Sequence, residues 1–146
     1  MSIKEDKIKD VSNYSVMVVD DSFLMRNVIK NIIEKDEAFT IVEEAANGQE
    51  AIDKLTSANP DIILLDIEMP VMDGLEFLQV SRLKTDAKII VISSVVNIDS
   101  PIARKLTSLG AVDMICKPSG VLSVDLEDKK STEILDAIHR CIEMYA

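Results

Sequence analysis

Five short apolar runs alternate along the chain with longer segments whose apolar residues recur at helical spacing. Such alternation is typical of repeated strand and helix units that build a parallel sheet. Because crossovers between parallel strands are right-handed, five units predict an α/β, doubly wound, three-layer sandwich with helices on both faces of the sheet. The expected strands are Val16 to Val19, Thr40 to Glu44, Ile62 to Leu65, Ile89 to Ile92 and Val112 to Cys116.

Capping residues mark where the helices between these strands begin and end. Ser22 can cap the first helix, and Asn47 can cap the second. In the first helix, Leu24, Val28 and Ile32 recur on one face. The remaining helices are expected over Leu75 to Arg82, from Ser100-Pro101 to Gly110, and from Ser131 onward.

The chain has 146 residues, enough for one domain with a substantial core that needs no disulfide or metal. Residues 1–13 are polar and lack periodicity, so they are expected to form a flexible N-terminal extension to a single domain over residues 14–146. Cys116, in an expected strand, and Cys141, on a helix face, are expected to be buried packing groups. His139 falls on the polar side of the last helix and is expected at the surface.

The formal net charge of -10 argues against binding of nucleic acid or of an anionic membrane, since no basic cluster offsets their phosphates. Cations and basic protein surfaces are the expected partners. The N-terminal residues lack an apolar secretion core, and no apolar run approaches the roughly 18 residues that span a bilayer. The sequence therefore predicts a cytoplasmic protein without membrane insertion.

Polar and charged residues follow four of the expected strands. They are Asp20 and Asp21, Asp66, Ser93, and Lys117. Since ligands in such sheets bind beyond the carboxyl ends of the strands, these side chains are expected to converge. Two carboxylates about 4 Å apart would repel by roughly 4 kcal/mol at an effective dielectric near 20, so the three acids need compensation. A divalent, oxygen-seeking cation, above all Mg²⁺, would supply it.

The same residues permit transfer of a phosphoryl group. Lys117 can act as a point charge for one phosphoryl oxygen, and the Ser93 hydroxyl can donate a hydrogen bond to another. Asp66 is the expected nucleophile, because an aspartate can form an acyl phosphate while metal and lysine neutralise the charge. Taken alone, an acidic pair or a Lys-Pro sequence is common in surface turns. The prediction therefore depends on all the strand ends together.

The motifs at these strand ends are Val-Val-Asp20-Asp21-Ser, Asp66-Ile-Glu-Met-Pro-Val-Met-Asp-Gly74, Ile-Ser93-Ser94 and Lys117-Pro118. Because it carries these motifs, the chain resembles a bacterial response-regulator receiver domain from about Val16 to Tyr145. The resemblance implies a flavodoxin-like, five-stranded parallel sheet in the order 2-1-3-4-5. It also implies that Asp66 takes a phosphoryl group from a partner histidine kinase, and that this two-component signal switches an output face.

The resemblance also implies a set of metal ligands. Asp21 and Asp66 would bind Mg²⁺, or Mn²⁺, directly, and Asp20 would assist through water. The backbone carbonyl of Glu68 would complete the ligands that the protein supplies.

The remaining positions of the family pattern concern the phosphoryl group and the switch. The resemblance implies that Ser93 and Lys117 hold the phosphoryl oxygens, with Ser94 beside them, and that the Lys117-Pro118 bond is cis. Receivers usually have Tyr or Phe three residues before the lysine, and this chain has Met114. A flexible thioether can still pack inward, but the aromatic part of the switch is not carried over.

Several segments are similar to the receiver portion of chemotaxis protein-glutamate methylesterases, among them Met25-Arg26, Ser93-Ser94 and Gly110 to Gly120. The catalytic portion of those enzymes has its own serine nucleophile and is not expected before Ala146. We therefore expect no enzyme beyond the domain's own phosphorylation and dephosphorylation. The chain would be a stand-alone receiver or the regulatory part of a methylesterase. Its expected partners are a histidine kinase and either a downstream protein or a covalently linked methylesterase domain.

The connection from Pro118 to Lys130 is long for a strand-helix loop. We expect it to belong to the output surface that the family forms from its fourth helix, fifth strand and fifth helix.

Three other functions share parts of this pattern. An aspartyl-phosphate hydrolase of another family would place an Asp-x-Asp nucleophile after its first strand, whereas Asp20-Asp21 has no second acid two residues on. A flavodoxin-type redox carrier generally needs aromatic cover for its flavin, and this chain has no Trp and only 3% aromatic residues. An interaction module that works without phosphorylation would not need every expected acid and base, and all are present.

Overall fold

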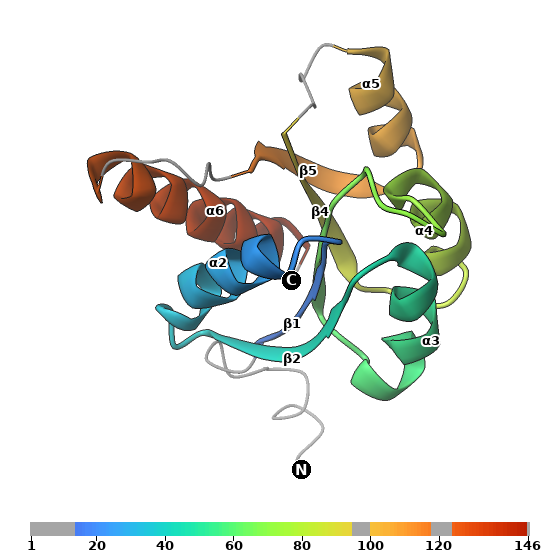
Figure 1. The fold of residues 1–146 in the computed structure, drawn as a ribbon, viewed down its shortest axis with the longest axis horizontal. Coiled ribbons are helices and arrows are strands. Elements are labelled where there is room, and N and C mark those ends of the chain that lie inside the picture. Colours follow the sequence, from blue (N-terminus) through green and yellow to red (C-terminus); the bar gives the residue numbers. More distant parts are fainter. Residues whose placement is uncertain (1–13, 95–99, 118–123, 146) are drawn as a thin grey trace.

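The computed structural model describes residues 14–94, 100–117 and 124–145, with the backbone alone for 124–130 and 144–145. Five parallel strands form one sheet in the order β2-β1-β3-β4-β5, and helices cover both of its faces (Figure 1). The predicted fold class and strand order are therefore confirmed. The strands are β1 (Tyr14–Val19), β2 (Phe39–Ala45), β3 (Ile62–Leu65), β4 (Lys88–Ser93) and β5 (Ala111–Cys116).

The helices of the described residues are α2 (Phe23–Glu34), α3 (Gly48–Ala58), α4 (Gly74–Ser81), α5 (Pro101–Ser108) and α6 (Val124–Tyr145). The predicted caps of α2, α3 and α5 are confirmed, because the side chains of Ser22, Asn47 and Ser100 each accept a hydrogen bond from a backbone N–H in the first turn. Leu109 is the C-cap residue of α5, and Gly110 follows it with a φ of 109°. Gly110 is therefore the C′ glycine that the sequence predicted.

Alternate residues of the central strands supply two separate apolar layers. Val16 and Val18 of β1 pack in the layer under α2 and α6, whereas Met17 and Val19 pack in the layer under α3, α4 and α5. Strands that are buried on both faces have continuous apolar sequences, and for this reason the strands could be predicted from the sequence. No helix of the described part of the chain is both long and apolar enough to cross a membrane.

The buried face of α2 differs from the expected one. Ile32 is buried as expected, but Leu24 is 68% exposed, and the buried neighbours of Ile32 are Ile29 and Ile33. Each step of four residues turns a helix about 40° past a full circle, so Leu24 is rotated about 80° from Ile32. The prediction that Leu24 shares this face was wrong for that reason.

The last helix begins earlier than expected. α6 starts at Val124, and Ser131, the expected first residue, is buried within it. Four of the seven residues in 124–130 are Leu, Glu or Lys, which have high helix propensity, although the segment lacks the apolar stripe that marks the rest of α6. The expected loop from Pro118 to Lys130 is therefore mostly helix. Its residues 118–123 lie outside the described residues, as does the expected extension over 1–13.

The two cysteines have different environments. Cys141 is buried in α6 as expected, but Cys116 is exposed. Cys116 is the last residue of β5, which is an edge strand of the sheet, so the prediction of a buried thiol was wrong there.

His139 is partly exposed, and it has partners that the sequence did not indicate. Its Nε2 lies 2.7 Å from Asp36 Oδ2, and its ring centroid lies 5.0 Å from that of Phe39. This contact joins α6 to the turn between α2 and β2.

The His139 contact predicts a pH-dependent part of the stability. Hydrogen bonds from His139 and from the Ala38 N–H hold the pKa of Asp36 below its ordinary value. The stabilisation is present above the ordinary pKa of Asp36 and is lost as pH falls through the lowered one. We expect Asp36→Asn to lose about 1 kcal/mol or less at pH 7, because the pair is partly exposed. Urea unfolding should show wild type and variant converging in acid, and Asp53→Asn, on the exposed face of α3, should not change stability.

Candidate functional site

The carboxyl ends of β1 and β3 bring three acids together. The Asp66 N–H donates to the Val19 carbonyl at 2.9 Å, which fixes the end of β3 beside the end of β1. Asp20 and Asp66 are 1% and 4% exposed, whereas Asp21 is exposed. One carboxylate oxygen from each of the three lies within 4.8 Å of the others. The structure thus brings together the acids that the strand pattern predicted.

Lys117 reaches the same cluster from the end of β5. Its Nζ lies 2.8 Å from Asp20 Oδ2 and 3.1 Å from Asp66 Oδ2, and its side chain is 16% exposed. The amine therefore lies on the same rim of the sheet as the acids.

The charges of the cluster are not balanced by Lys117 alone. Burial raises the pKa of Asp66, the negative charge of Asp20 raises it further, and Lys117 and the Ile67 N–H offset only part of this. Burial alone would lower the pKa of Lys117, but the combined effect of Asp20 and Asp66 outweighs it and raises the pKa. The two shifts have different causes, because burial is the main cause at Asp66, whereas the neighbouring carboxylates are the cause at Lys117.

The donor set fits a divalent cation. It consists of carboxylate oxygens, the hard ligands that Mg²⁺ prefers, and it retains negative charge after Lys117 is counted. Asp20 Oδ2 is buried and receives no well-aligned hydrogen bond from the described residues, although Lys117 Nζ lies near it. A carboxylate oxygen has two lone pairs, so Asp20 Oδ2 can accept a bound cation in addition to its contact with Lys117. Asp20, Asp21 and Asp66 are the residues that could hold the ion.

The other expected site residues lie around this cluster. Ser93 is buried at the end of β4, and its carbonyl accepts a hydrogen bond of 3.3 Å from the Lys117 N–H. Ser94 and Glu68 are exposed, and Met114 is half-buried against the layer under α3, α4 and α5. The expected cis bond between Lys117 and Pro118 lies outside the described residues.

The loop after Asp66 is tightly folded. The Met72 N–H donates to the Pro70 carbonyl at 2.7 Å, so Val71 is the central residue of a γ-turn, with φ of 69°. The Gly74 N–H then donates to the Ile67 carbonyl at 2.8 Å. A Cβ on Gly74 would lie 2.5 Å from the Asp66 carbonyl oxygen, so this approach needs glycine.

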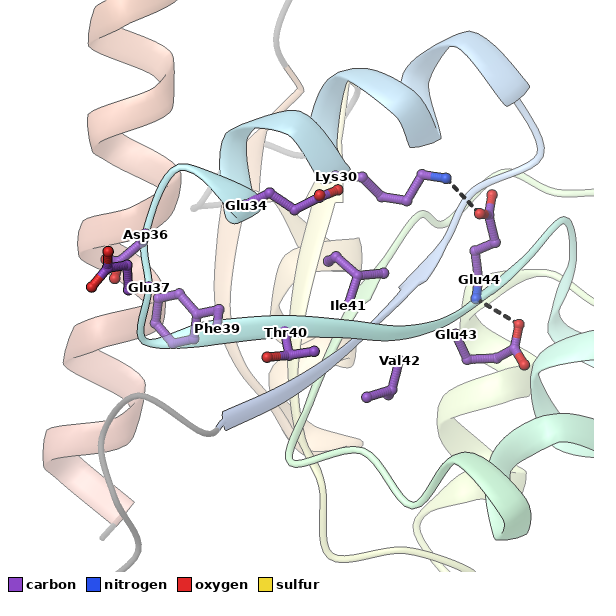
Figure 2. Close-up of a pocket in the computed structure, with 10 residues that line it drawn as sticks. All are labelled: Lys30, Glu34, Asp36, Glu37, Phe39, Thr40, Ile41, Val42, Glu43 and Glu44. Atoms are coloured by element: carbon purple, nitrogen blue, oxygen red, sulfur yellow. Dashed lines mark hydrogen bonds and ion pairs between the residues drawn. The ribbon is translucent and has the colours of Figure 1, made fainter.

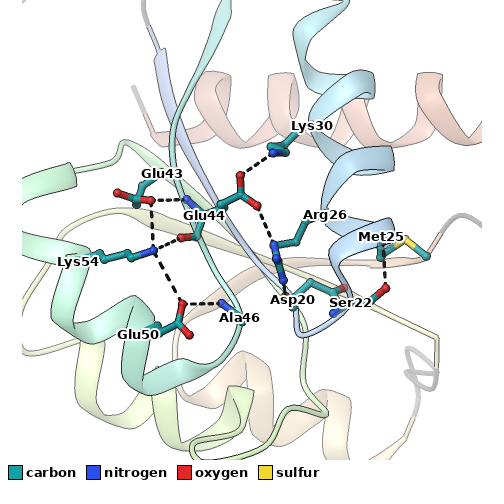
Figure 3. Close-up of polar contacts among 10 residues, drawn as sticks. All are labelled: Asp20, Ser22, Met25, Arg26, Lys30, Glu43, Glu44, Ala46, Glu50 and Lys54. Carbon is teal, nitrogen blue, oxygen red and sulfur yellow. Dashed lines mark hydrogen bonds and ion pairs between the residues drawn. The ribbon is translucent and has the colours of Figure 1, made fainter.

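Arg26 belongs to one of the segments similar to methylesterase receivers, but its contacts with the acidic turn were not predicted from the sequence. Its Nη1 donates to the Asp20 carbonyl at 2.7 Å, and its Nε donates to Glu44 Oε1 at 2.7 Å (Figure 3). Apart from that resemblance, the signal in the sequence was a basic residue one turn into the helix that follows the acidic pair.

A cavity of about 580 Å³ lies away from the acids, along the edge strand β2 (Figure 2). Three of its acids are already engaged, Glu44 with Lys30, Glu43 with Lys54 and Asp36 with His139. Its size does not make it the site of chemistry, because the buried, charge-rich cluster is elsewhere. The cavity is lined by Lys30, Glu34, Asp36, Glu37 and residues 39–44.

Comparison with known proteins points in the same direction. A model of the response regulator receiver domain family matches residues 16–124. The chain is 44% identical over 116 residues to a protein-glutamate methylesterase/protein-glutamine glutaminase of Halalkalibacterium halodurans, covering 80% of this chain and 34% of the relative. A relative of the same description from Treponema pallidum is 40% identical over 132 residues, covering 90% of this chain and 32% of the relative. The chain thus spans about a third of the length of these curated relatives.

Two solved structures are similar over most of the chain. One is the response regulator domain of Thermotoga maritima CheB, with a TM-score of 0.79 and 36% identity, covering 87% of this chain and 94% of that one. The other is a chain in the crystal structure of the P1 domain of CheA3 in complex with CheY6 from R. sphaeroides, with a TM-score of 0.74 and 45% identity, covering 89% and 97%.

Proposed function

Because this chain belongs to the response regulator receiver domain family and is a receiver of the chemotaxis type, similar to that of CheB, we propose that Asp66 accepts a phosphoryl group from a histidine kinase. The observation that carries the proposal is the position of Lys117 Nζ, within 3.1 Å of Asp66 and close to Asp20. A nucleophilic carboxylate, two further acids and an amine at one rim match the needs of phosphoryl transfer.

In the proposed reaction, an oxygen of Asp66 attacks phosphorus in line with the bond to the donor imidazole nitrogen. The new O–P bond makes Asp66 an acyl phosphate, and the electron pair of the broken P–N bond leaves with the imidazole. The Ile67 N–H, which donates to Asp66 Oδ1 at 2.8 Å, fixes the orientation of the carboxylate. Lys117 binds one phosphoryl oxygen, and the Ser93 hydroxyl donates to another, with Ser94 beside it.

Asp21 and Asp66 would hold Mg²⁺ or Mn²⁺ directly, with Asp20 assisting and the Glu68 carbonyl completing the set. When bound, the cation neutralises charge on the phosphoryl oxygens. Burial and the charge of Asp20 raise the pKa of Asp66, and a bound cation would act in the opposite direction by favouring the carboxylate.

The signal would leave the site through the end of β4. A dianionic group on Asp66 would draw the Ser93 hydroxyl toward it, and the start of α5 would follow, shifting a balance between two conformations. The output face is proposed on α5, β5 and α6, with the half-buried Met114 in place of an aromatic ring. The cytoplasmic location remains part of this proposal.

The target of the output face could be a domain of the same protein or a separate protein. The curated relatives are methylesterases, of which this chain matches about a third. We therefore propose as the target either a covalently linked methylesterase domain or a separate downstream protein. The chain's own chemistry would be its phosphorylation and dephosphorylation.

Incubation with acetyl phosphate and Mg²⁺ tests the function. Intact-mass analysis should show one phosphoryl group per chain, and EDTA should prevent labelling, because without the cation the charge on the phosphoryl oxygens is not neutralised. Release of many phosphates per chain from a phosphomonoester would instead favour an aspartyl-phosphate hydrolase. Unlabelled protein that still binds its partners would favour a phosphorylation-independent interaction module. A yellow purified protein would favour a flavin carrier.

A further inference from the structure

The backbone of Asp20 is held on both sides. Its N–H donates to the Ala45 carbonyl of β2 at 3.0 Å, and its carbonyl accepts from Arg26 Nη1 at 2.7 Å. Its carboxylate Oδ1 also accepts from the Ser22 N–H at 2.9 Å. The turn that presents Asp20 and Asp21 therefore has its conformation set by contacts outside the site.

Arg26 is itself anchored. Its side chain is only 13% exposed, and its Nε donates to Glu44 Oε1, while Lys30 Nζ binds Glu44 Oε2 at 2.5 Å (Figure 3). Lys30 and then Arg26 lower the pKa of Glu44, which therefore stays ionised. One planar guanidinium group thus joins the edge strand β2 to the backbone of the acidic turn, a geometry that a lysine cannot reproduce.

We propose that Arg26 is a positioning residue of the metal site: through Glu44 and the Asp20 carbonyl it fixes the turn in the form that offers the Asp20 and Asp21 carboxylates to a divalent cation. The inference rests on the proposed function and deepens it, because it identifies a residue outside the ligand set that controls metal affinity. Groups that orient metal ligands change affinity by about 10 to 100-fold when they are removed.

A positioning role of Arg26 can be separated from a simple effect of its charge, because the two predict opposite changes in cation affinity when Arg26 is removed. Arg26 is positive and lies close to the acids, so by Coulomb's law its removal should strengthen binding of a cation. If Arg26 instead positions the turn, its removal should weaken binding.

Titration with Mn²⁺ alone, followed by the electron paramagnetic resonance signal of the free ion, measures this affinity. We expect Arg26→Gln to weaken Mn²⁺ binding by about tenfold. Lys30→Gln is the matched control, since Lys30 shares the Glu44 carboxylate and the same helix but does not contact Asp20. It should leave Mn²⁺ affinity unchanged.

A second variant and a second readout exclude a general loss of structure. Arg26→Lys keeps the charge and the helix propensity, so it should fold, but because a lysine cannot bridge Glu44 and the Asp20 carbonyl, it should weaken Mn²⁺ binding at least as much as Arg26→Gln. For both variants, acetyl phosphate labelling at saturating metal should return toward the wild-type rate.

Unchanged or tighter Mn²⁺ binding by Arg26→Gln, or equal weakening by Lys30→Gln, would overturn the inference and leave the proposed function intact. Wild-type protein that neither binds Mn²⁺ nor becomes labelled would instead overturn both.

Discussion

Asp66→Asn is expected to abolish labelling by acetyl phosphate completely. Asparagine keeps the shape of the side chain but has no anionic oxygen to attack phosphorus. In wild type, Asp66 Oδ1 accepts from the Ile67 N–H and Oδ2 lies 3.1 Å from Lys117. Intact-mass analysis of the two proteins side by side, with Mg²⁺ present, measures the difference.

Glu68→Gln is the matched control for this substitution. Glu68 lies two residues further along and is exposed, and its proposed role uses only the backbone carbonyl, which the variant keeps. It should still take up one phosphoryl group per chain. Equal labelling of Asp66→Asn and wild type would show that the acceptor is another residue.

Asp66→Asn is also expected to change how the stability of the protein depends on pH. Because the pKa of Asp66 is raised in the folded protein, its ionisation destabilises the fold above that pKa. As pH falls from the raised pKa toward the ordinary value of 3.8, wild type should regain this stability. Asp66→Asn has no proton to take up and should lack the rise. Urea unfolding in EDTA at several pH values would detect it.

Gly74→Ala is expected to have the largest effect on both stability and labelling among substitutions outside the charged cluster. The added Cβ would lie 2.5 Å from the Asp66 carbonyl oxygen and 2.8 Å from Ile67 Cα. Both neighbours are backbone atoms and cannot rotate away. We expect a loss of about 3 kcal/mol, at the upper end for overpacking, and slower labelling because Asp66 is displaced.

Gly110→Ala is the control for Gly74→Ala. A Cβ there would have nothing within 4 Å, so the cost is limited to the left-handed backbone, with φ of 109°. That cost is about 1 to 2 kcal/mol. Urea unfolding and the rate of labelling should then separate the two glycines: only Gly74→Ala should slow labelling. A Gly74→Ala protein with wild-type stability and rate would mean that the loop after Asp66 can relax.

The strands and the rim of the sheet could be predicted because each depends on a strong local pattern. The apolar runs of β3 and β4 are buried on both faces, and polar residues in otherwise apolar stretches mark where the strands end. Parallel strands then place Asp20, Asp66 and Lys117 at one rim. That conclusion needs the topology but no distances.

The remaining features depend on contacts between segments that are far apart in the sequence. The pairing of His139 with Asp36 spans more than a hundred residues, and the bond from Arg26 to the Asp20 carbonyl uses a backbone group that no side-chain pattern reveals. The exposure of Cys116 follows from the position of β5 at the sheet edge. The start of α6 was missed because residues 124–130 lack an apolar stripe, although several of them have high helix propensity.

The different environments of the two thiols give the chain a natural attachment point for a spectroscopic reporter. Burial raises the pKa of Cys141 and keeps it from maleimide dyes, while the exposed Cys116 is open to them. A fluorophore on Cys116 would stand next to Lys117, at the rim where the acids meet. Occupancy of that rim could then be followed optically in a protein that contains no tryptophan.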